Sequence, residues 1–175
     1  MSPFVSIVRF VLPAALALAA GCAGYSWRPS VPSEARSVAV PTFANESAVT
    51  ELGAVVTRQV LREFQREGTY RLAAVGDGAL EVQGRVKSGH SHVVAYERST
   101  GLRNREHRFT VVAEVSFIDK KSGKVLVNDR TYRASTTFLA ANDVMSGERD
   151  ASGRIGEELA RQIVDDALAL KWETE

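Results

Sequence analysis

The only cysteine of the chain, Cys22, directly follows small residues near the N-terminus. Its thiolate would be a nucleophile, and a single cysteine has no disulfide partner within the chain. Residues 10–20 before it are apolar, interrupted only by Pro13, and Arg9 precedes them. This run is shorter than the about 20 apolar residues that a permanent membrane-spanning helix requires. It is typical of the hydrophobic region of a secretory signal, so we predict that residues 1–21 are a signal peptide.

The placement of Cys22 after Ala19, Ala20 and Gly21 resembles the lipobox of bacterial lipoproteins. In that family the thiol receives a diacylglycerol, the signal is cut before the cysteine, and the new amine is acylated, commonly with palmitate. Several acyl chains give stable anchoring, since each buried methylene contributes about 0.8 kcal/mol. Ala23, which is not an aspartate, favours the outer membrane in the sorting rule of that family. The alternative is an ordinary signal peptide followed by a chance cysteine.

Three histidines are the other candidates for chemistry. His90 and His92 would share one face of a strand, and His107 would lie opposite them in a hairpin, so that the three would offer imidazole ligands for zinc. No other cysteine and no carboxylate cluster completes such a set, so surface histidines are the favoured interpretation. The sequence also lacks a Gly-x-Ser-x-Gly nucleophile motif and a glycine-rich phosphate loop. We therefore predict no catalytic residues, no metal and no cofactor.

Composition limits the class of partner. The chain has 22 basic and 21 acidic residues, and loss of Arg9 with the signal peptide leaves the side-chain charges balanced. A neutral chain gives no electrostatic argument for nucleic-acid binding. Pro29 and Pro32 disfavour a helix, so we expect residues 22–36 to form a lipidated, extended tether and residues 37–172 to form a single α/β domain.

Alternating apolar residues predict strands and a period of 3.6 predicts helices. A first strand is expected over 37–43 and a helix over 48–67, with Asn45 and Ser47 as capping residues and Gly68 as the stop. Arg58, Arg62 and Arg66 recur at every fourth position of this helix; a solvated face is favoured over a phosphate contact. The remaining expected elements are a strand at 70–75, a strand from 80 toward 96, a strand at 109–117, a hairpin loop at 119–124, a strand at 125–136 and a helix at 151–170.

The expected order is β-α-β-β-β-β-α. Each helix has one apolar stripe and each long strand has one apolar face, so the elements predict an α+β two-layer sandwich. Two helices would pack on one face of a mixed four- to five-stranded sheet. The other sheet face would be polar and uncovered, as a surface for contact or simply facing water.

The mature chain resembles the LPS-assembly lipoprotein family, LptE, in the form found in bacteria distant from the enteric group. The resemblance is carried by residues 21–25, the segment 37–45, the segment 62–71, the segment 121–126 and the closing helix. It implies a lipid-anchored protein on the periplasmic face of the outer membrane. Such proteins plug a large β-barrel translocon of the LptD type, support its assembly, and help pass lipopolysaccharide to the outer leaflet.

Lipopolysaccharide carries phosphates, which would attract cations in the loops. The candidates for binding it are Arg103 and Arg105 in one connection and Lys120, Lys121 and Lys124 in the hairpin. Solubilising loop charges are the alternative for any one of them.

The segment 38–47 also looks like the start of outer-membrane lipoproteins that activate penicillin-binding proteins. That similarity implies a regulator of peptidoglycan synthesis. Such activators usually have a long disordered arm, and the short tether expected here argues against this second hypothesis.

Overall fold

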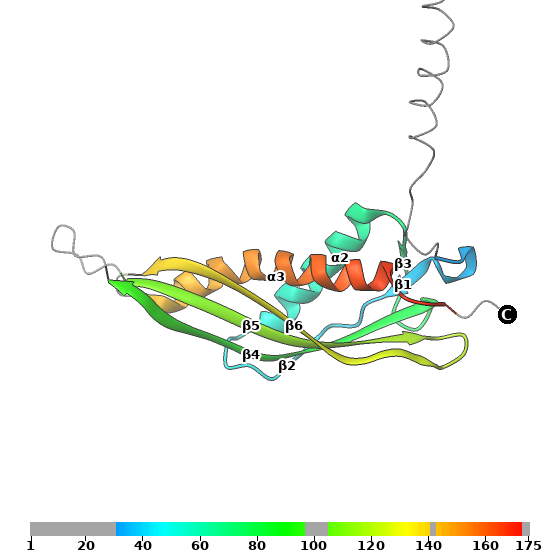
Figure 1. Ribbon diagram of the computed structural model, residues 1–175, viewed down its shortest axis with the longest axis horizontal. Helices are drawn as coiled ribbons and strands as arrows, with labels where there is room; N and C mark the ends of the chain where they lie inside the picture. Colours follow the sequence, from blue (N-terminus) through cyan, green and yellow to red (C-terminus); the bar gives the residue numbers. More distant parts are fainter. Residues whose placement is uncertain (1–30, 97–104, 141–142, 173–175) are drawn as a thin grey trace, which may run out of the picture.

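The computed structural model describes residues 31–96, 105–140 and 143–172 (Figure 1). The described elements reproduce the predicted order and add a short helix and a two-residue strand. They are η2 (Ser33–Ala35), β1 (Ser37–Ala39), β2 (Ala44–Asn45), α2 (Leu52–Glu67), β3 (Arg71–Leu72), β4 (Leu80–Tyr96), β5 (Arg105–Asp119), β6 (Val125–Ala140) and α3 (Val144–Leu168).

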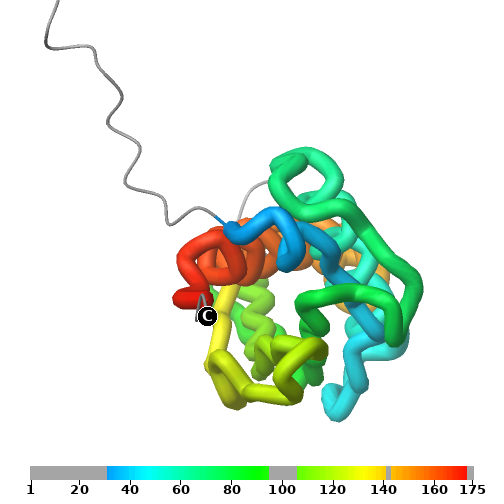
Figure 2. The backbone as a smooth tube through the Cα atoms, turned by 90° about the vertical axis from the view of Figure 1, so that its right-hand side faces the viewer, coloured from blue at the N-terminus to red at the C-terminus, as the bar shows by residue number. Residues whose placement is uncertain are grey.

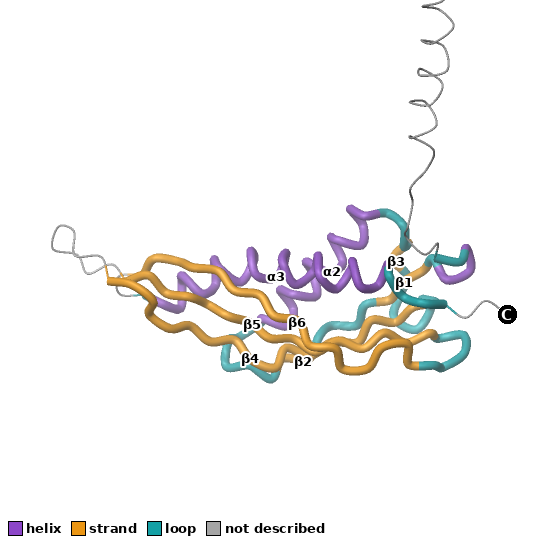
Figure 3. The backbone as a smooth tube through the Cα atoms, viewed as in Figure 1, coloured by secondary structure: helices purple, strands orange, loops and turns teal. Residues whose placement is uncertain are grey.

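The strands form one mixed sheet. Its order is β3-β1-β4-β5-β6, with β2 paired to β4. The short strand β1 is parallel to β3 and β4, whereas β4, β5 and β6 are antiparallel neighbours. Helices α2 and α3 lie side by side on one face of this sheet (Figure 2, Figure 3). The α+β two-layer fold is therefore confirmed.

The core fills the space between the sheet and the two helices. Every second residue of β5 from Phe109 to Phe117 is fully buried, as the alternating pattern predicted. The helices contribute apolar residues at helical spacing, because only one stripe of each helix faces the sheet. The buried stripe of α2 comprises Leu52, Val56, Val60 and Phe64, and that of α3 comprises Ile155, Leu159, Ile163 and Ala167.

A register shift between Val86 and Ser88 changes which side chains of β4 face the core. Before it, Val82 and Val86 are buried. After it, Gly89 packs against Leu52 of α2. A β-bulge of this kind inserts one unpaired residue and moves the alternation by one place.

The start of α2 differs from the predicted one. The helix begins at Leu52, because residues 45–49 form a turn in which the Asn45 side chain accepts from the Ser47 amide and donates to the Val49 carbonyl. No side chain caps the helix. Its end is as predicted: Gly68 has a φ of 80° and its amide donates to the Phe64 carbonyl at 3.1 Å.

Helix α3 begins seven residues before the predicted start. The Asp143 carboxylate accepts from the Ser146 amide at 3.0 Å, so it caps a helix that starts at Val144. Gly147, which was expected in a loop, lies within the helix, where a Cβ would come 2.3 Å from the ring of Phe138. The glycine allows the first turn of α3 to approach the sheet closely.

Residues 31–36, expected to belong to the extended tether, pack against the domain. Val31 and Ala35 are buried, and the Arg36 side chain donates to the Val31 carbonyl at 3.1 Å. In the described part of the chain, no helix combines the length and the apolar character that crossing a membrane requires. The predicted signal peptide and residues 22–30 of the tether lie outside the described residues.

Candidate functional site

The structure places the predicted basic residues at two ends of the long strands. Cys22 and Arg103 lie outside the described residues. Arg105 opens β5, whereas Lys120, Lys121 and Lys124 follow its other end. The 15 residues of β5 separate these ends by about 45 Å, at about 3.3 Å per residue.

The hairpin between β5 and β6 is folded by Asp119. Its carboxylate accepts from the Lys121 amide at 2.9 Å and from the Ser122 hydroxyl at 2.6 Å. Gly123 has a φ of 70°, in the left-handed region that favours glycine. Burial alone would raise the pKa of Asp119, but these hydrogen bonds outweigh it and hold the pKa below its ordinary value. The ionised carboxylate therefore accepts both hydrogen bonds that close the loop.

Lys120 points back to the sheet. Its ammonium lies 3.1 Å from the carboxylate of Glu81, whose side chain is 7% exposed. Glu81 also accepts a hydrogen bond from Gln83, and this bond, more than Lys120, holds the pKa of Glu81 below its ordinary value. The burial of Glu81 means that Lys120 neutralises an interior charge.

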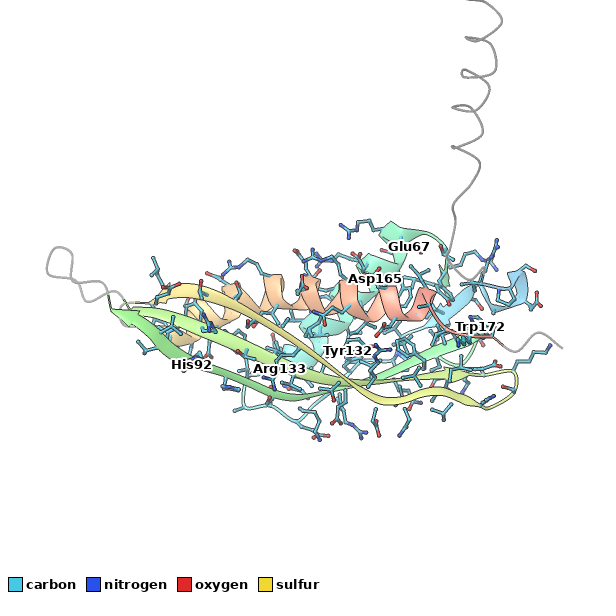
Figure 4. The ribbon with its side chains drawn as sticks, viewed as in Figure 1. Glu67, His92, Tyr132, Arg133, Asp165 and Trp172 are labelled. Carbon is cyan, nitrogen blue, oxygen red and sulfur yellow. The ribbon has the colours of Figure 1, made fainter. Side chains whose placement is uncertain are left out.

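Lys121 and Lys124 line a cavity of about 510 Å³ at the hairpin end of the domain. The rest of the lining comes from η2, the loop before β4, the hairpin, β6 and the C-terminal segment: Pro32, Glu34, Ala35, Ala79, Asp119, Ser122, Leu126 and Trp172. The lining combines the indole of Trp172 (Figure 4) and aliphatic residues with two lysines and with the carboxylates of Glu34 and Asp119.

Glu34 and Trp172 are members of this cavity that sequence reasoning missed. Glu34 belonged to the predicted tether, and Trp172 lies beyond the last helix. The pKa of Glu34 is lowered, first by a backbone hydrogen bond and then by the Ser33 hydroxyl, with a smaller contribution from Lys121. The cavity thus places a carboxylate near one of its lysines. The available sequence signal was Trp172 itself, because a large aromatic residue at the predicted end of the domain suggests that this end packs against the domain.

The sheet face away from the helices carries cross-strand ion pairs. Arg85 of β4 pairs with Glu114 of β5 at 3.1 Å and with Asp129 of β6. Asp129 adopts a φ of 44° at a register shift, where its amide donates to the Ser116 hydroxyl at 2.8 Å. Lys87 similarly pairs with Glu46. Figure 4 shows side chains projecting freely from this face.

The histidines do not gather. His90 and His92 are exposed, with ring centroids 6.5 Å apart. His107 is 7% exposed and stacks on Phe138 at 5.4 Å, so its assignment as a surface residue was wrong. It occupies a core position of β5 in the same alternation as Phe109. Across residues 31–96, 105–140 and 143–172, no three potential metal ligands come together.

Solved structures with the same fold share little sequence with this chain. A hypothetical protein from Chlamydia trachomatis has a TM-score of 0.53 at 12% identity and covers 77% of this chain and 96% of its own. A protein from Xanthomonas campestris has a TM-score of 0.52 at 9% identity, covering 81% and 87%. A homolog of the neuraminyllactose-binding hemagglutinin from Helicobacter pylori has a TM-score of 0.50 at 12% identity, covering 82% and 91%. At this level of identity the likeness concerns the fold alone.

Comparison with protein-family models identifies a family, which the structural matches do not. The family model for LptE, described as lipopolysaccharide-assembly, matches residues 35–167. This range extends from η2 almost to the end of α3. No curated protein matches the chain in sequence.

Proposed function

The chain belongs to the LptE lipopolysaccharide-assembly family, and from this premise we propose that it is an outer-membrane lipoprotein that assists insertion of lipopolysaccharide into the outer leaflet. We infer that it does so by plugging an LptD-type barrel and supporting its assembly. The match over nearly the whole described domain is the observation that carries the proposal. The role is binding rather than turnover.

The uncovered sheet face supports the plugging role. The interior of a large outer-membrane barrel is polar. The uncovered sheet face carries an ion-pair network with positive and negative side chains, formed by Arg85, Glu114 and Asp129. The face therefore offers hydrogen-bonding groups to a polar wall. We propose that this face meets the barrel wall.

The cavity at the hairpin supports contact with lipopolysaccharide. A lysine ammonium forms strong, charge-assisted hydrogen bonds with phosphate. Lys121 and Lys124 line the cavity, so we propose these two as the principal contacts. Arg103 and Arg105 stay proposed as a separate group at the other end of β5.

Anchoring rests on Cys22. Acyl chains on this residue would hold the domain at the periplasmic face of the outer membrane, where its proposed partners are. Co-purification tests the proposed barrel partner: the protein carries a C-terminal tag and is purified from detergent extracts. We expect a large outer-membrane barrel to co-purify, and depletion of the protein to reduce both folded barrel and surface lipopolysaccharide. Recovery of a peptidoglycan synthase instead would favour the activator hypothesis.

Reversal of the hairpin charges tests the lipopolysaccharide site. The double variant Lys121→Glu/Lys124→Glu is expected to lower affinity for lipopolysaccharide by about tenfold or more at low salt, with the difference shrinking as ionic strength rises. Affinity would be measured by titration of purified protein at two salt concentrations.

The matched control reverses two charges on the sheet face, Arg108→Glu/Arg133→Glu, and leaves the hairpin intact. An equal loss of affinity in the control would mean that net charge, and not the cavity, governs binding. Full affinity in the hairpin variant would remove the cavity from the site.

A further inference from the structure

The hairpin cavity combines charged, hydroxyl and aromatic groups in a space that fits one small molecule. Its volume of about 510 Å³ lies within the range of about 300–1,000 Å³ that is usual for small-molecule pockets. The ionisable residues of its lining are Glu34, Asp119, Lys121 and Lys124. A complete lipopolysaccharide molecule, with several acyl chains, is too large for this space. The cavity can therefore take only a part of it.

Both carboxylates of the lining can accept hydrogen bonds from a ligand. A carboxylate has about four acceptor positions, and Asp119 uses two of them for the Lys121 amide and the Ser122 hydroxyl. Glu34 is exposed and accepts from the Ser33 hydroxyl at 2.8 Å. Acceptor positions thus remain on both side chains, and they suit a ligand with hydroxyl groups.

The charges of the lining make the cavity unsuitable for an acyl chain. Hydrocarbon laid over a charged group removes its water and offers no hydrogen bond in return, which is unfavourable. A ligand that fits must instead bring donors to the carboxylates and an anion to the lysines. Phosphate meets the second requirement, because hydrogen bonds between ionised partners are strong.

Trp172 adds a flat carbon surface to the cavity (Figure 4). Its indole nitrogen is buried and lies near the hydroxyl of Tyr70, whereas the residue as a whole is partly exposed. The part of the indole that can meet a ligand is therefore ring carbon and not the N–H group. The C–H face of a sugar ring packs on such a surface, because both are apolar and flat, while the sugar hydroxyls stay free for polar groups.

We propose that the hairpin cavity binds one phosphorylated sugar unit of lipopolysaccharide, with the phosphate at Lys121 and Lys124 and the sugar ring against Trp172. This inference rests on the proposed function and names the part of the lipopolysaccharide molecule that the cavity recognises. Glu34 accepts a hydrogen bond from a sugar hydroxyl. The acyl chains stay outside the cavity.

Three small probes separate the contributions of sugar and phosphate. N-acetylglucosamine 1-phosphate, N-acetylglucosamine and inorganic phosphate are each titrated by calorimetry into the purified full-length protein in detergent. We expect the sugar phosphate to bind about tenfold or more tightly than either of the other probes, because it alone contacts both the lysines and the indole. Lipopolysaccharide is expected to displace the sugar phosphate, which would distinguish it from a free sugar phosphate as the source of the ligand.

Variants of the lining assign each part of the probe to its side chain. Trp172→Leu is expected to reduce the preference for sugar phosphate over inorganic phosphate to about threefold or less, and Trp172→Phe, which keeps an aromatic face, to retain most of it. Lys121→Gln is expected to weaken both phosphate probes about threefold or more and to leave the preference unchanged. The matched control Lys87→Gln removes one charge from the sheet face, where Lys87 pairs with Glu46, and is expected to change neither quantity.

The outcomes separate this inference from the proposed function. Equal affinity of the wild type for sugar phosphate and inorganic phosphate overturns the sugar contact without the need for any variant to fold. An undiminished preference in Trp172→Leu, with folding checked by urea unfolding, overturns it as well. If affinity for lipopolysaccharide still depends on Lys121 in either case, the proposed function stands and this inference alone fails. A wild-type protein that does not bind lipopolysaccharide overturns both.

Discussion

At the scale of single residues, two buried tyrosine hydroxyls hold the C-terminal part of α3. Tyr70 donates to the Ala167 carbonyl at 2.9 Å, and Tyr132 donates to the Asp166 carboxylate at 2.7 Å. Burial raises the pKa of Tyr70 to about 12. Burial, followed by the hydrogen bond to Asp166, also raises the pKa of Tyr132 above its ordinary value.

These pKa values predict alkaline destabilisation. An unfolded tyrosine loses its proton near pH 10, whereas folded Tyr70 keeps it until about pH 12. Unfolding therefore releases a proton in this window, and the free energy of unfolding falls as pH rises through it. Below pH 10 the contribution of Tyr70 is complete. Urea unfolding from pH 8, where the contribution is complete, to pH 11, inside the window between the two pKa values, would measure the slope.

The variant Tyr70→Phe isolates one of the two groups. At neutral pH it is expected to lose about 1–2 kcal/mol of unfolding free energy, because the buried Ala167 carbonyl loses its hydrogen-bond donor. Its alkaline slope is expected to be shallower than that of the wild type. An identical slope would mean that Tyr70 does not contribute to the pH dependence.

At the scale of elements, the long strands and the helices are joined by close contacts at glycines. Gly84 of β4 leaves room for the ring of Phe43, to which a Cβ would come within 2.3 Å. Gly147 plays the same part between α3 and Phe138. A glycine at these positions thus allows neighbouring segments to approach closely. In the sequence the same glycine resembles an interruption of the strand or helix pattern.

Alanine at two glycines is expected to have opposite effects. Gly84→Ala would force the buried Phe43 ring to move and is expected to cost about 1–3 kcal/mol of unfolding free energy. Gly153, in the interior of α3, has no neighbour within 4 Å of a Cβ. Gly153→Ala is therefore expected to stabilise by up to about 1 kcal/mol through helix propensity. Both would be measured by urea unfolding, and equal stability of the two variants would contradict the crowding argument.

At the scale of the whole molecule, the domain has two different sides. The exposed arginines of α2, Arg58, Arg62 and Arg66, lie on the outside of the helix layer, and the ion pairs of Arg85 lie on the opposite side of the sheet. The described chain starts at one end of the strands, where the hairpin cavity also lies (Figure 1). The proposed contact with a barrel wall uses the side that carries these ion pairs.

Loss of the anchor tests this arrangement. The Cys22→Ala variant is expected to move from the membrane fraction to the soluble periplasmic fraction, because it lacks the thiol to which the proposed acyl chains would be attached. Fractionation followed by immunoblotting would measure the distribution. The Ser47→Ala variant, which changes only the mature domain, serves as the control and is expected to stay in the membrane fraction. Retention of Cys22→Ala in the membrane would contradict lipid anchoring.

Much of the fold was predictable because burial imposes a local period on the sequence. The alternation from Phe109 to Phe117 predicted β5 and its buried face correctly, and Gly68 predicted the end of α2. The start of α3 was not predictable, because Gly147 looks like a loop residue in the sequence. A glycine is needed inside the helix only because the ring of Phe138 packs against it. The burial of His107 was missed because the strand was expected to start at Phe109, although His107 continues the same alternation.

The sequence by itself determined the element order, the one-sided helices, the resemblance to the LptE family and the hairpin with its lysines. These features follow from side-chain periods and turn residues, which act over a few positions. Only the tertiary structure decided that Lys120 neutralises Glu81 and that Lys121 and Lys124 share a cavity with Trp172. Each of these depends on distances between segments far apart in the chain, which packing of the core sets and local sequence does not.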